Sequence, residues 1–237
     1  MKKKRKKVRL SGFIFLVLLV YLIGVSIYYI VKLPVKNIKI EGNNLLSEGE
    51  IIQAIGLEDS FPMIKFTKGH LKDKFKDLPL VDSFDIKKNL KGQVTIKIKE
   101  AKILFYYDYE GKLVLSNGKT IEDNNDYLGY PTLVNYVPSD TFKSFINNFS
   151  NVDTDIIAMI SEIKYSPEVW KDVMIDDERF IFLMNDGNEV YINVLNLDKM
   201  NKYQSVVAKT NQKGTLYLDS SSNNFIFKVA GTNEDQL

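Results

Sequence analysis

The chain has no cysteine and only one histidine, His70, among its 237 residues. The absence of cysteine excludes disulfide bonds, thiolate nucleophiles and cysteine-ligated metal or iron–sulfur sites. His70 has no second histidine to complete a metal site, so a solvated position on a helix is the better interpretation. A Ser-His-Asp triad would have to use it, and no Gly-x-Ser-x-Gly elbow occurs. We expect no catalytic residue, no metal and no cofactor.

Arginine is also scarce, and positive charge is concentrated at one end. Only three of the 32 basic residues are arginine, the side chain best suited to bidentate contacts with bases. Beyond position nine the chain has 25 basic and 30 acidic residues, a net charge of −5, which argues against nucleic-acid binding. The first nine residues contain no acid and seven bases, which we expect to set membrane topology: Lys2, Lys3, Lys4, Arg5, Lys6, Lys7 and Arg9.

Three local patterns resemble functional motifs but lack essential parts. Ser161-Glu162-Ile163-Lys164 matches the Ser-x-x-Lys of penicillin-binding enzymes, without the Ser-Asp-Asn and Lys-Thr-Gly motifs that accompany it. Gly118-Lys119-Thr120 ends like a phosphate-binding loop, but Leu113 stands where that loop needs glycine. The acids around 172–178 lack calcium-loop spacing and predict a solvated turn, and nearby Trp170 is interpreted as a core or sheet-face residue.

Residues 10–31 form a run of 22 residues without a charge. As a helix this run is about 33 Å long, enough to cross a hydrocarbon core of about 30 Å. Tyr28 and Tyr29 lie near its far end, as interfacial aromatic residues do, and Lys32 ends it. The basic stub, residues 1–9, predicts a cytoplasmic N-terminus and an external remainder. We interpret the run as an uncleaved signal anchor of a single-pass protein in the cell membrane.

A cleaved signal peptide is the alternative. Gly24 and Ser26 form a possible small-x-small cleavage site. The apolar run continues past Ser26, however, and it exceeds the 7–15 residues usual for the apolar region of a signal peptide. A signal anchor therefore explains the segment better.

Residues 33–101 predict a small α+β domain with the order strand, helix, helix, strand, strand. Residues 35–41 alternate as a strand, and Ser47-Glu48-Gly49-Glu50 has the form of a capping box. A second helix from about 68 to 78 would present one apolar stripe, followed by strands over 81–89 and 93–100. We expect four of the apolar residues to share a core: Leu71, Phe75, Ile96 and Ile98.

Residues 102–230 predict a larger mixed α+β domain, followed by a frayed polar tail over 231–237. Strands are expected over 103–109, 112–116, 173–176, 180–184 and 189–194. Helical stripes are expected at 142–149, 156–160 and 197–209, and the last strands at 215–218 and 225–229.

Two stretches make a family resemblance visible. Val35-x-x-Ile38-x-Ile40-x-Gly42-Asn43 followed by Leu46-Ser47-x-x-x-Ile51 resembles the opening of a POTRA domain. Asn117-Gly118-Lys119 followed by Tyr130-Pro131-Thr132-Leu133-Val134 is similar to a hairpin and proline segment of the DivIB/FtsQ family of bacterial cell-division proteins. The resemblance implies a non-enzymatic role in stabilising or assembling the septal division complex. It also implies DivIC and FtsL as partners, near the septal wall synthases.

A POTRA-bearing factor for protein translocation or envelope assembly is the alternative function. Such a factor would carry many transmembrane strands of about ten alternating residues after the POTRA domain. The helical stripes predicted after residue 101 disfavour it.

The last two strands are the expected partner surface, because a terminal strand often leaves a sheet edge unpaired. A partner strand added there would gain main-chain hydrogen bonds. Phe225, Phe227 and Val229 are predicted to face the core, and a proline at Ile226 or Lys228 would remove an edge donor if that amide faces the edge. The candidate partner-binding residues are Thr215, Leu216, Tyr217, Phe225, Ile226, Phe227 and Lys228.

A reporter fused after Leu237 tests the topology. We expect it to be active only outside the cell, because the basic stub holds the N-terminus in the cytoplasm. Mass spectrometry of the purified protein should find Met1 retained or removed alone. A mature species beginning near Ile27 would instead establish the signal peptide.

Overall fold

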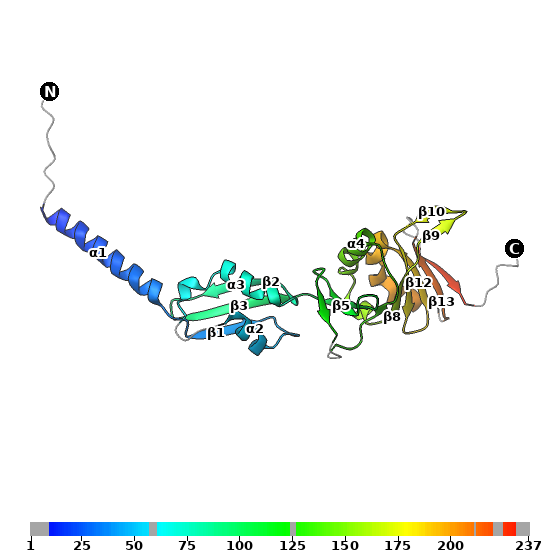
Figure 1. Ribbon diagram of the computed structural model, residues 1–237, viewed down its shortest axis with the longest axis horizontal. Coiled ribbons are helices and arrows are strands. Elements are labelled where there is room, and N and C mark those ends of the chain that lie inside the picture. The colour runs from blue at the N-terminus through cyan, green and yellow to red at the C-terminus, as the bar shows by residue number, and fades with distance from the viewer. Residues whose placement is uncertain (1–9, 57–60, 124–126, 211, 220–224, 231–237) are drawn as a thin grey trace, which may run out of the picture. The chain divides into compact units, whose positions relative to one another are not determined.

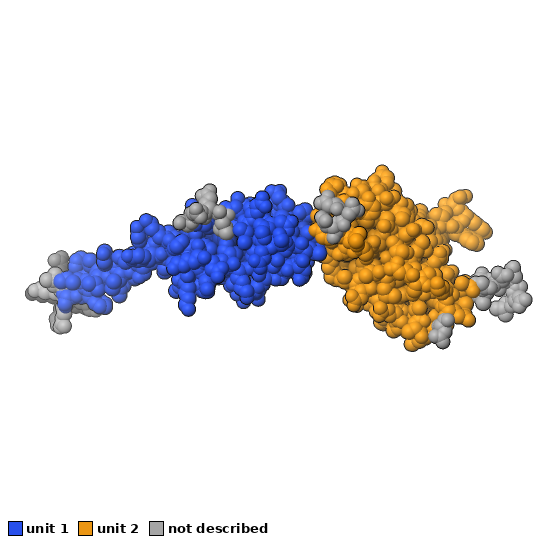
Figure 2. Space-filling view, turned by 90° about the horizontal axis from the view of Figure 1, so that it is seen from below, with its two compact units in different colours: residues 1–100 blue, residues 101–237 orange. Residues whose placement is uncertain are grey.

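The computed structural model describes residues 10–56, 61–123, 127–210, 212–219 and 225–230. The chain divides into two compact units, residues 1–100 and 101–237 (Figure 2). The seven basic residues predicted to set topology, the 220–224 turn and the 231–237 tail lie outside the described residues.

The first unit begins with α1 (Leu10–Lys32), a helix long and apolar enough to cross a membrane (Figure 1). Its 18-residue window of highest hydropathy averages 2.7, and none of that window is buried in the protein. Exposure of such an apolar helix to water would be unfavourable, which fits a hydrocarbon environment. The segment predicted as a membrane anchor is therefore one continuous helix.

The remainder of the first unit has the predicted β-α-α-β-β order. Its elements are β1 (Asn37–Glu41), α2 (Glu48–Ile55), η1 (Met63–Lys65), α3 (Lys68–Lys74), η2 (Phe75–Asp77), β2 (Val81–Lys88) and β3 (Gln93–Glu100). The sheet order is β1-β3-β2, with β1 parallel and β2 antiparallel to β3. The helix predicted over 68–78 tightens into the 3₁₀ turn η2 before Pro79, a common way for a helix to end.

Local contacts explain why this unit forms. The predicted capping box is confirmed: Ser47 accepts a hydrogen bond from Glu50 N, and the Glu50 carboxylate accepts one from Ser47 N. The Glu100 carboxylate accepts from Leu45 N and Leu46 N at 2.9 and 2.8 Å, holding the entry loop against the end of β3. Gly42 has a φ of +87°, and a Cβ there would lie 2.2 Å from Ile98 O, so only glycine fits this turn.

The second unit is built on a nine-stranded mixed sheet in the order β14-β13-β12-β11-β8-β7-β4-β5-β6. Its strands are β4 (Ile103–Tyr107), β5 (Lys112–Leu115), β6 (Thr120–Glu122), β7 (Thr132–Leu133), β8 (Ile160–Tyr165), β11 (Arg179–Met184), β12 (Glu189–Asn193), β13 (Gly214–Leu218) and β14 (Ile226–Val229). A separate hairpin comprises β9 (Glu168–Trp170) and β10 (Val173–Asp176). The helices are α4 (Ser139–Phe149), α5 (Thr154–Ile157), η3 (Val194–Lys202) and α6 (Tyr203–Val207).

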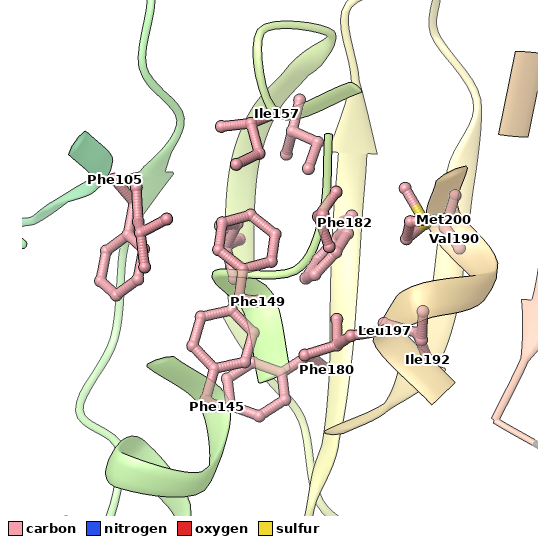
Figure 3. Close-up of a cluster of buried hydrophobic side chains, with 14 of the residues drawn as sticks. Phe105, Phe145, Phe149, Ile157, Phe180, Phe182, Val190, Ile192, Leu197 and Met200 are labelled. Atoms are coloured by element: carbon pink, nitrogen blue, oxygen red, sulfur yellow. The ribbon is translucent and has the colours of Figure 1, made fainter. Parts of the chain in front are cut away.

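A phenylalanine cluster between α4 and the sheet forms the centre of the core (Figure 3). The Phe145 ring stacks on the Phe180 ring with centroids 4.2 Å apart, and on the Phe149 ring at 5.0 Å. Phe105 and Phe182 contribute further rings from β4 and β11, within 6.3 Å of Phe145. These rings are buried, so they hold together strands from distant parts of the sheet.

Two of the predicted helices are wrong in part. Ile160, assigned to a helical stripe with Ile156 and Ile157, begins β8 instead. An irregularity in the β8–β11 register places both Ile160 and Ile163 in the core, which imitates helical spacing. The helix predicted over 197–209 is the 3₁₀ helix η3 followed by the short α6. At the start of η3, the Asn193 side chain accepts a hydrogen bond from Leu195 N. Such local side-chain bonds compete with α-helical backbone pairing.

Phe75→Ala tests the core of the first unit. All four residues predicted to share it are buried, and the Phe75 ring lies edge-on to Phe84 with centroids 5.0 Å apart. We expect the variant to lose about 3–5 kcal/mol of unfolding free energy, measured by urea denaturation of residues 33–237. Leu90→Ala, at a side chain that is 77% exposed, is the control and should change little. An unchanged midpoint for Phe75→Ala would contradict the core assignment.

Candidate partner-binding strand

β14 lies at one end of the nine-stranded sheet, and among the described residues its only neighbouring strand is β13. The two strands are antiparallel, with Leu216 opposite Phe227 and Tyr217 opposite Ile226. On its other side β13 runs parallel to β12. The strand predicted as a terminal edge thus has one backbone side paired with β13 and the other directed away from the sheet.

Side chains along β14 alternate between two environments, as predicted. Phe225 and Phe227 are partly buried and pack against the core cluster. Ile226 is 48% exposed and Lys228 is exposed, so both face outward. This alternation fixes the register of β14, because a slip by one residue would place the phenylalanines in water.

Backbone amides alternate together with the side chains. Ala230 N donates to Lys213 O at 3.0 Å, which makes this a hydrogen-bonded pair of the β13–β14 ladder. Hydrogen-bonded and non-bonded pairs alternate in antiparallel ladders, so the amides of Lys228 and Ile226 point toward β13. The amide of Phe227 points to the outer edge. The proline positions proposed from sequence, Ile226 and Lys228, are therefore wrong as probes of the edge.

The outward face beside this edge carries a row of aromatic and cationic side chains. The Tyr191 and Tyr217 rings stack across β12 and β13 with centroids 5.2 Å apart. The Arg179 guanidinium lies 5.5 Å from the Tyr191 ring centroid, and Lys228 Nζ lies 5.3 Å from that of Tyr217. Burial raises the pKa of the Tyr191 hydroxyl. A partner strand paired with β14 could pack its side chains against Tyr217, Ile226 and the aliphatic part of Lys228.

A buried polar network positions β13. Asn188 is only 3% exposed; its Oδ1 accepts from Gly214 N at 2.8 Å, and its Nδ2 donates to the Tyr203 hydroxyl at 3.0 Å. The Tyr203 hydroxyl donates to the Asp186 carboxylate at 2.8 Å. Burial raises the pKa of Tyr203, and the bond to Asp186 raises it further. The network joins the β11–β12 turn, α6 and the first residue of β13, and so sets where the edge begins.

Sequence reasoning missed Asn188 as a positioning residue. The run Asn185-Asp186-Gly187 has the composition of a turn, and Gly187 has a positive φ of +88°. Asn188 lies between this turn and β12, and nothing local indicates that its amide is buried. Only the packing of α6 and β13 around it reveals the role.

The other motif residues are placed apart from this edge. Ser161 Oγ donates to Leu183 O, and Lys164 Nζ lies 3.9 Å from the Glu162 carboxylate. The His70 ring is half-buried against Phe61, with centroids 5.5 Å apart, rather than freely solvated. Within the described ranges, no group of three His, Asp or Glu side chains is placed to hold a metal ion.

Comparison with known proteins supplies the class and the family. Residues 33–101 match the model of the FtsQ-type POTRA domain, and residues 106–220 match that of the FtsQ/DivIB C-terminal domain of cell division proteins. Together the two matches span more than three-quarters of the chain. The molecule is of the class that joins one candidate membrane helix to a POTRA domain and a larger sheet-rich domain.

Two DivIB proteins are similar to this chain over most of its length. DivIB of Listeria monocytogenes is 28% identical over 236 residues, covering 94% of this chain and 84% of its own length. DivIB of Brevibacillus brevis is 22% identical over 229 residues, covering 92% and 85%. A solved structure, the major extracytoplasmic domain of the trans isomer of DivIB from Geobacillus stearothermophilus, is 22% identical, with a TM-score of 0.37, and covers 48% of this chain and 96% of its own.

The chain belongs to the DivIB/FtsQ family of bacterial cell-division proteins. This is a family of division proteins and not a known enzyme family. Membership of this family and the apolar helix α1 together indicate that the chain is a membrane-anchored division protein.

Tyr203→Phe tests the network that positions β13. Loss of the hydroxyl removes one hydrogen bond from Asp186 and one from Asn188. The free energy of unfolding of residues 33–237 should therefore fall by about 1–2 kcal/mol at neutral pH. The pKa of Tyr203 is raised in the folded state, so its contribution is complete below about pH 10 and is lost as the pH rises further. The variant should lose stability less steeply above pH 10. Tyr109→Phe, at an exposed ring, is the control, and equal behaviour of the two variants would contradict this role.

Proposed function

We propose that the chain is a non-enzymatic division protein that stabilises or promotes assembly of the septal division complex through its extracytoplasmic domains. Membership of a division family supports the process. The observation that carries the mechanism is the strand β14, whose Phe227 amide points away from the sheet. A domain with such an edge can act by contact, because an added strand gains main-chain hydrogen bonds without any catalytic group.

The proposed topology places both domains outside the cell. The seven basic residues before α1 hold the N-terminus in the cytoplasm, since positive flanks are retained on that side. α1 then remains as the anchor and confines the domains to the outer surface of the cell membrane, at the division septum. In this proposal the helix α1 holds the protein at the membrane, and the two domains contact the partners.

The proposed partners are the division proteins DivIC and FtsL, with the septal wall synthases nearby. This assignment is supported by the family resemblance. We assign the partner strand to the edge of β14, with Ile226, Lys228 and Tyr217 as its side-chain contacts because they face outward. Thr215 is half-buried beside them. Leu216 is fully buried, and Phe225 and Phe227 face the core, so these three support the surface from within.

The alternative, a POTRA-bearing translocation or assembly factor, shares only the first domain with this proposal. The match of residues 106–220 to the FtsQ/DivIB C-terminal domain favours division.

Phe227→Pro compared with Phe227→Ala tests strand addition. Both variants remove the half-buried ring, but only proline also removes the amide that points to the edge. We expect the proline variant to bind the purified extracytoplasmic part of DivIC about three- to tenfold more weakly than the alanine variant does, the effect of losing one main-chain bond. Isothermal titration with residues 33–237 measures this difference.

Circular dichroism provides the folding control for both variants. Lys228→Pro is the matched second control, because its amide faces β13 and its loss should loosen β14 itself. Equal affinity of the Phe227→Pro and Phe227→Ala variants, both folded, would exclude addition of a strand at β14.

A further inference from the structure

The hairpin β9–β10 is apolar on both faces and exposed. Figure 1 shows it projecting from the body of the second unit, and its two strands are separate from the nine-stranded sheet. Trp170 is paired with Val173 on one face, and Val169 with Met174 on the other. The exposed fractions of the hairpin's apolar side chains are 53% for Val169, 66% for Trp170, 60% for Val173, 54% for Met174 and 59% for Ile175.

This arrangement contradicts a core position for Trp170, which lies on a face of the β9–β10 sheet but is exposed. Two-stranded hairpins are marginally stable in water, and contiguous exposed apolar surface on a soluble domain marks an interaction site. Tryptophan is also enriched among the residues that dominate binding energy at interfaces. The hairpin therefore has the composition of a binding element.

The hairpin is held stiffly at both ends. Lys171 and Asp172 both have positive φ, 48° and 66°, as in a tight two-residue turn whose twist matches the strands. At the base, Arg179 Nη1 lies 3.3 Å from the Glu168 carboxylate, and Asn193 Nδ2 donates to both oxygens of Asp176 at 2.8 and 2.9 Å. A preorganised element loses less conformational entropy when it binds.

Negative charge surrounds the base. A shallow hollow there is lined by five carboxylates, of which Glu168 pairs with Arg179: Glu168, Asp176, Asp177, Glu178 and Asp219. Burial raises the pKa of Asp219, and the charges of Glu168 and Asp176 raise it further while Arg179 lowers it. The occupant of a surface that joins apolar side chains to clustered acids must carry apolar groups flanked by cations.

We propose that the β9–β10 hairpin and this acidic hollow form a docking surface for a segment of another protein in which lysine or arginine side chains flank apolar residues. The apolar residues cover Trp170 and Val173, which share one face of the hairpin with Glu168, and the cations reach the hollow. An anionic lipid surface is disfavoured as the occupant, because the carboxylates of the hollow would repel it. The strands β9 and β10 do not pair with the sheet that contains β14.

Photocrosslinking in growing cells tests the proposal on the full chain. The probe is p-benzoylphenylalanine in place of Val173, which is 60% exposed on the face of Trp170. The same probe at Leu128, which is 84% exposed between β6 and β7, is the position control. The expected result is an adduct at position 173, absent at position 128, with a different protein. Sequencing of the crosslinked peptide should find at least two lysine or arginine residues close to the attachment point.

Matched charge variants sharpen the test. Asp177→Asn with Glu178→Gln keeps side-chain volume, and the hydrogen bonds that fix this segment use backbone atoms of both residues: Tyr165 Oη donates to Asp177 O, and Val194 N to Glu178 O. We expect this pair to reduce the adduct about three- to tenfold, the scale of two rim charges. Asp108→Asn with Glu110→Gln, at exposed positions elsewhere in the unit, should leave the adduct unchanged.

Four outcomes would overturn the proposal: no adduct above the position-128 control, an adduct with phospholipid, an adduct with a second copy of this chain, or a crosslinked peptide without net positive charge. The Phe227→Pro variant separates this surface from the proposed strand addition. Retention of the position-173 adduct in that variant is expected, and its loss would show that the two surfaces are not independent.

Discussion

Strand alternation is the constraint on which the candidate partner surface at β14 depends. In β14 the direction of each side chain and the direction of its amide are fixed together, so a residue cannot change one without the other. Phe225 and Phe227 pack against the core, and burial of such rings stabilises the register strongly. The Phe227 amide must then point out of the sheet. The hydrophobic core therefore determines which main-chain donor a partner can reach.

The rest of the second unit supports that geometry at two levels. The ring stack of Phe145 on Phe180 fastens α4 to β11, two strands away from β13 in the sheet order. Asn188 then fixes the start of β13 through Gly214 N. The two contributions to free energy differ in size. A buried phenylalanine contributes about 3–5 kcal/mol to stability, whereas one main-chain bond at an edge contributes about 0.5–1.5 kcal/mol. A stable scaffold can thus present a weaker, exchangeable contact, as the proposed role in assembly requires.

How far the sequence predicts this structure follows from how local each signal is. The capping box at Ser47 and the alternation of β14 are confirmed, because each depends on neighbours within a few residues. β8 could not be found, because its register irregularity imitates helical spacing. The direction of the Phe227 amide depends on which pairs of the β13–β14 ladder are hydrogen-bonded. The role of Asn188 depends on the packing of three separate elements: the β11–β12 turn, α6 and β13. Trp170 lies on a sheet face but is exposed, and composition alone does not show whether such a face is covered.

Residue-resolved hydrogen exchange of β14 tests the central claim most directly. In free residues 33–237, the amides of Ile226 and Lys228 should exchange slowly because they point toward β13, while the amide of Phe227 should exchange fast. Addition of the extracytoplasmic part of DivIC should slow exchange at Phe227 and leave the alternating pattern otherwise intact. Slow exchange at Phe227 in the free protein, or fast exchange there in a saturated complex, would contradict strand addition at this edge.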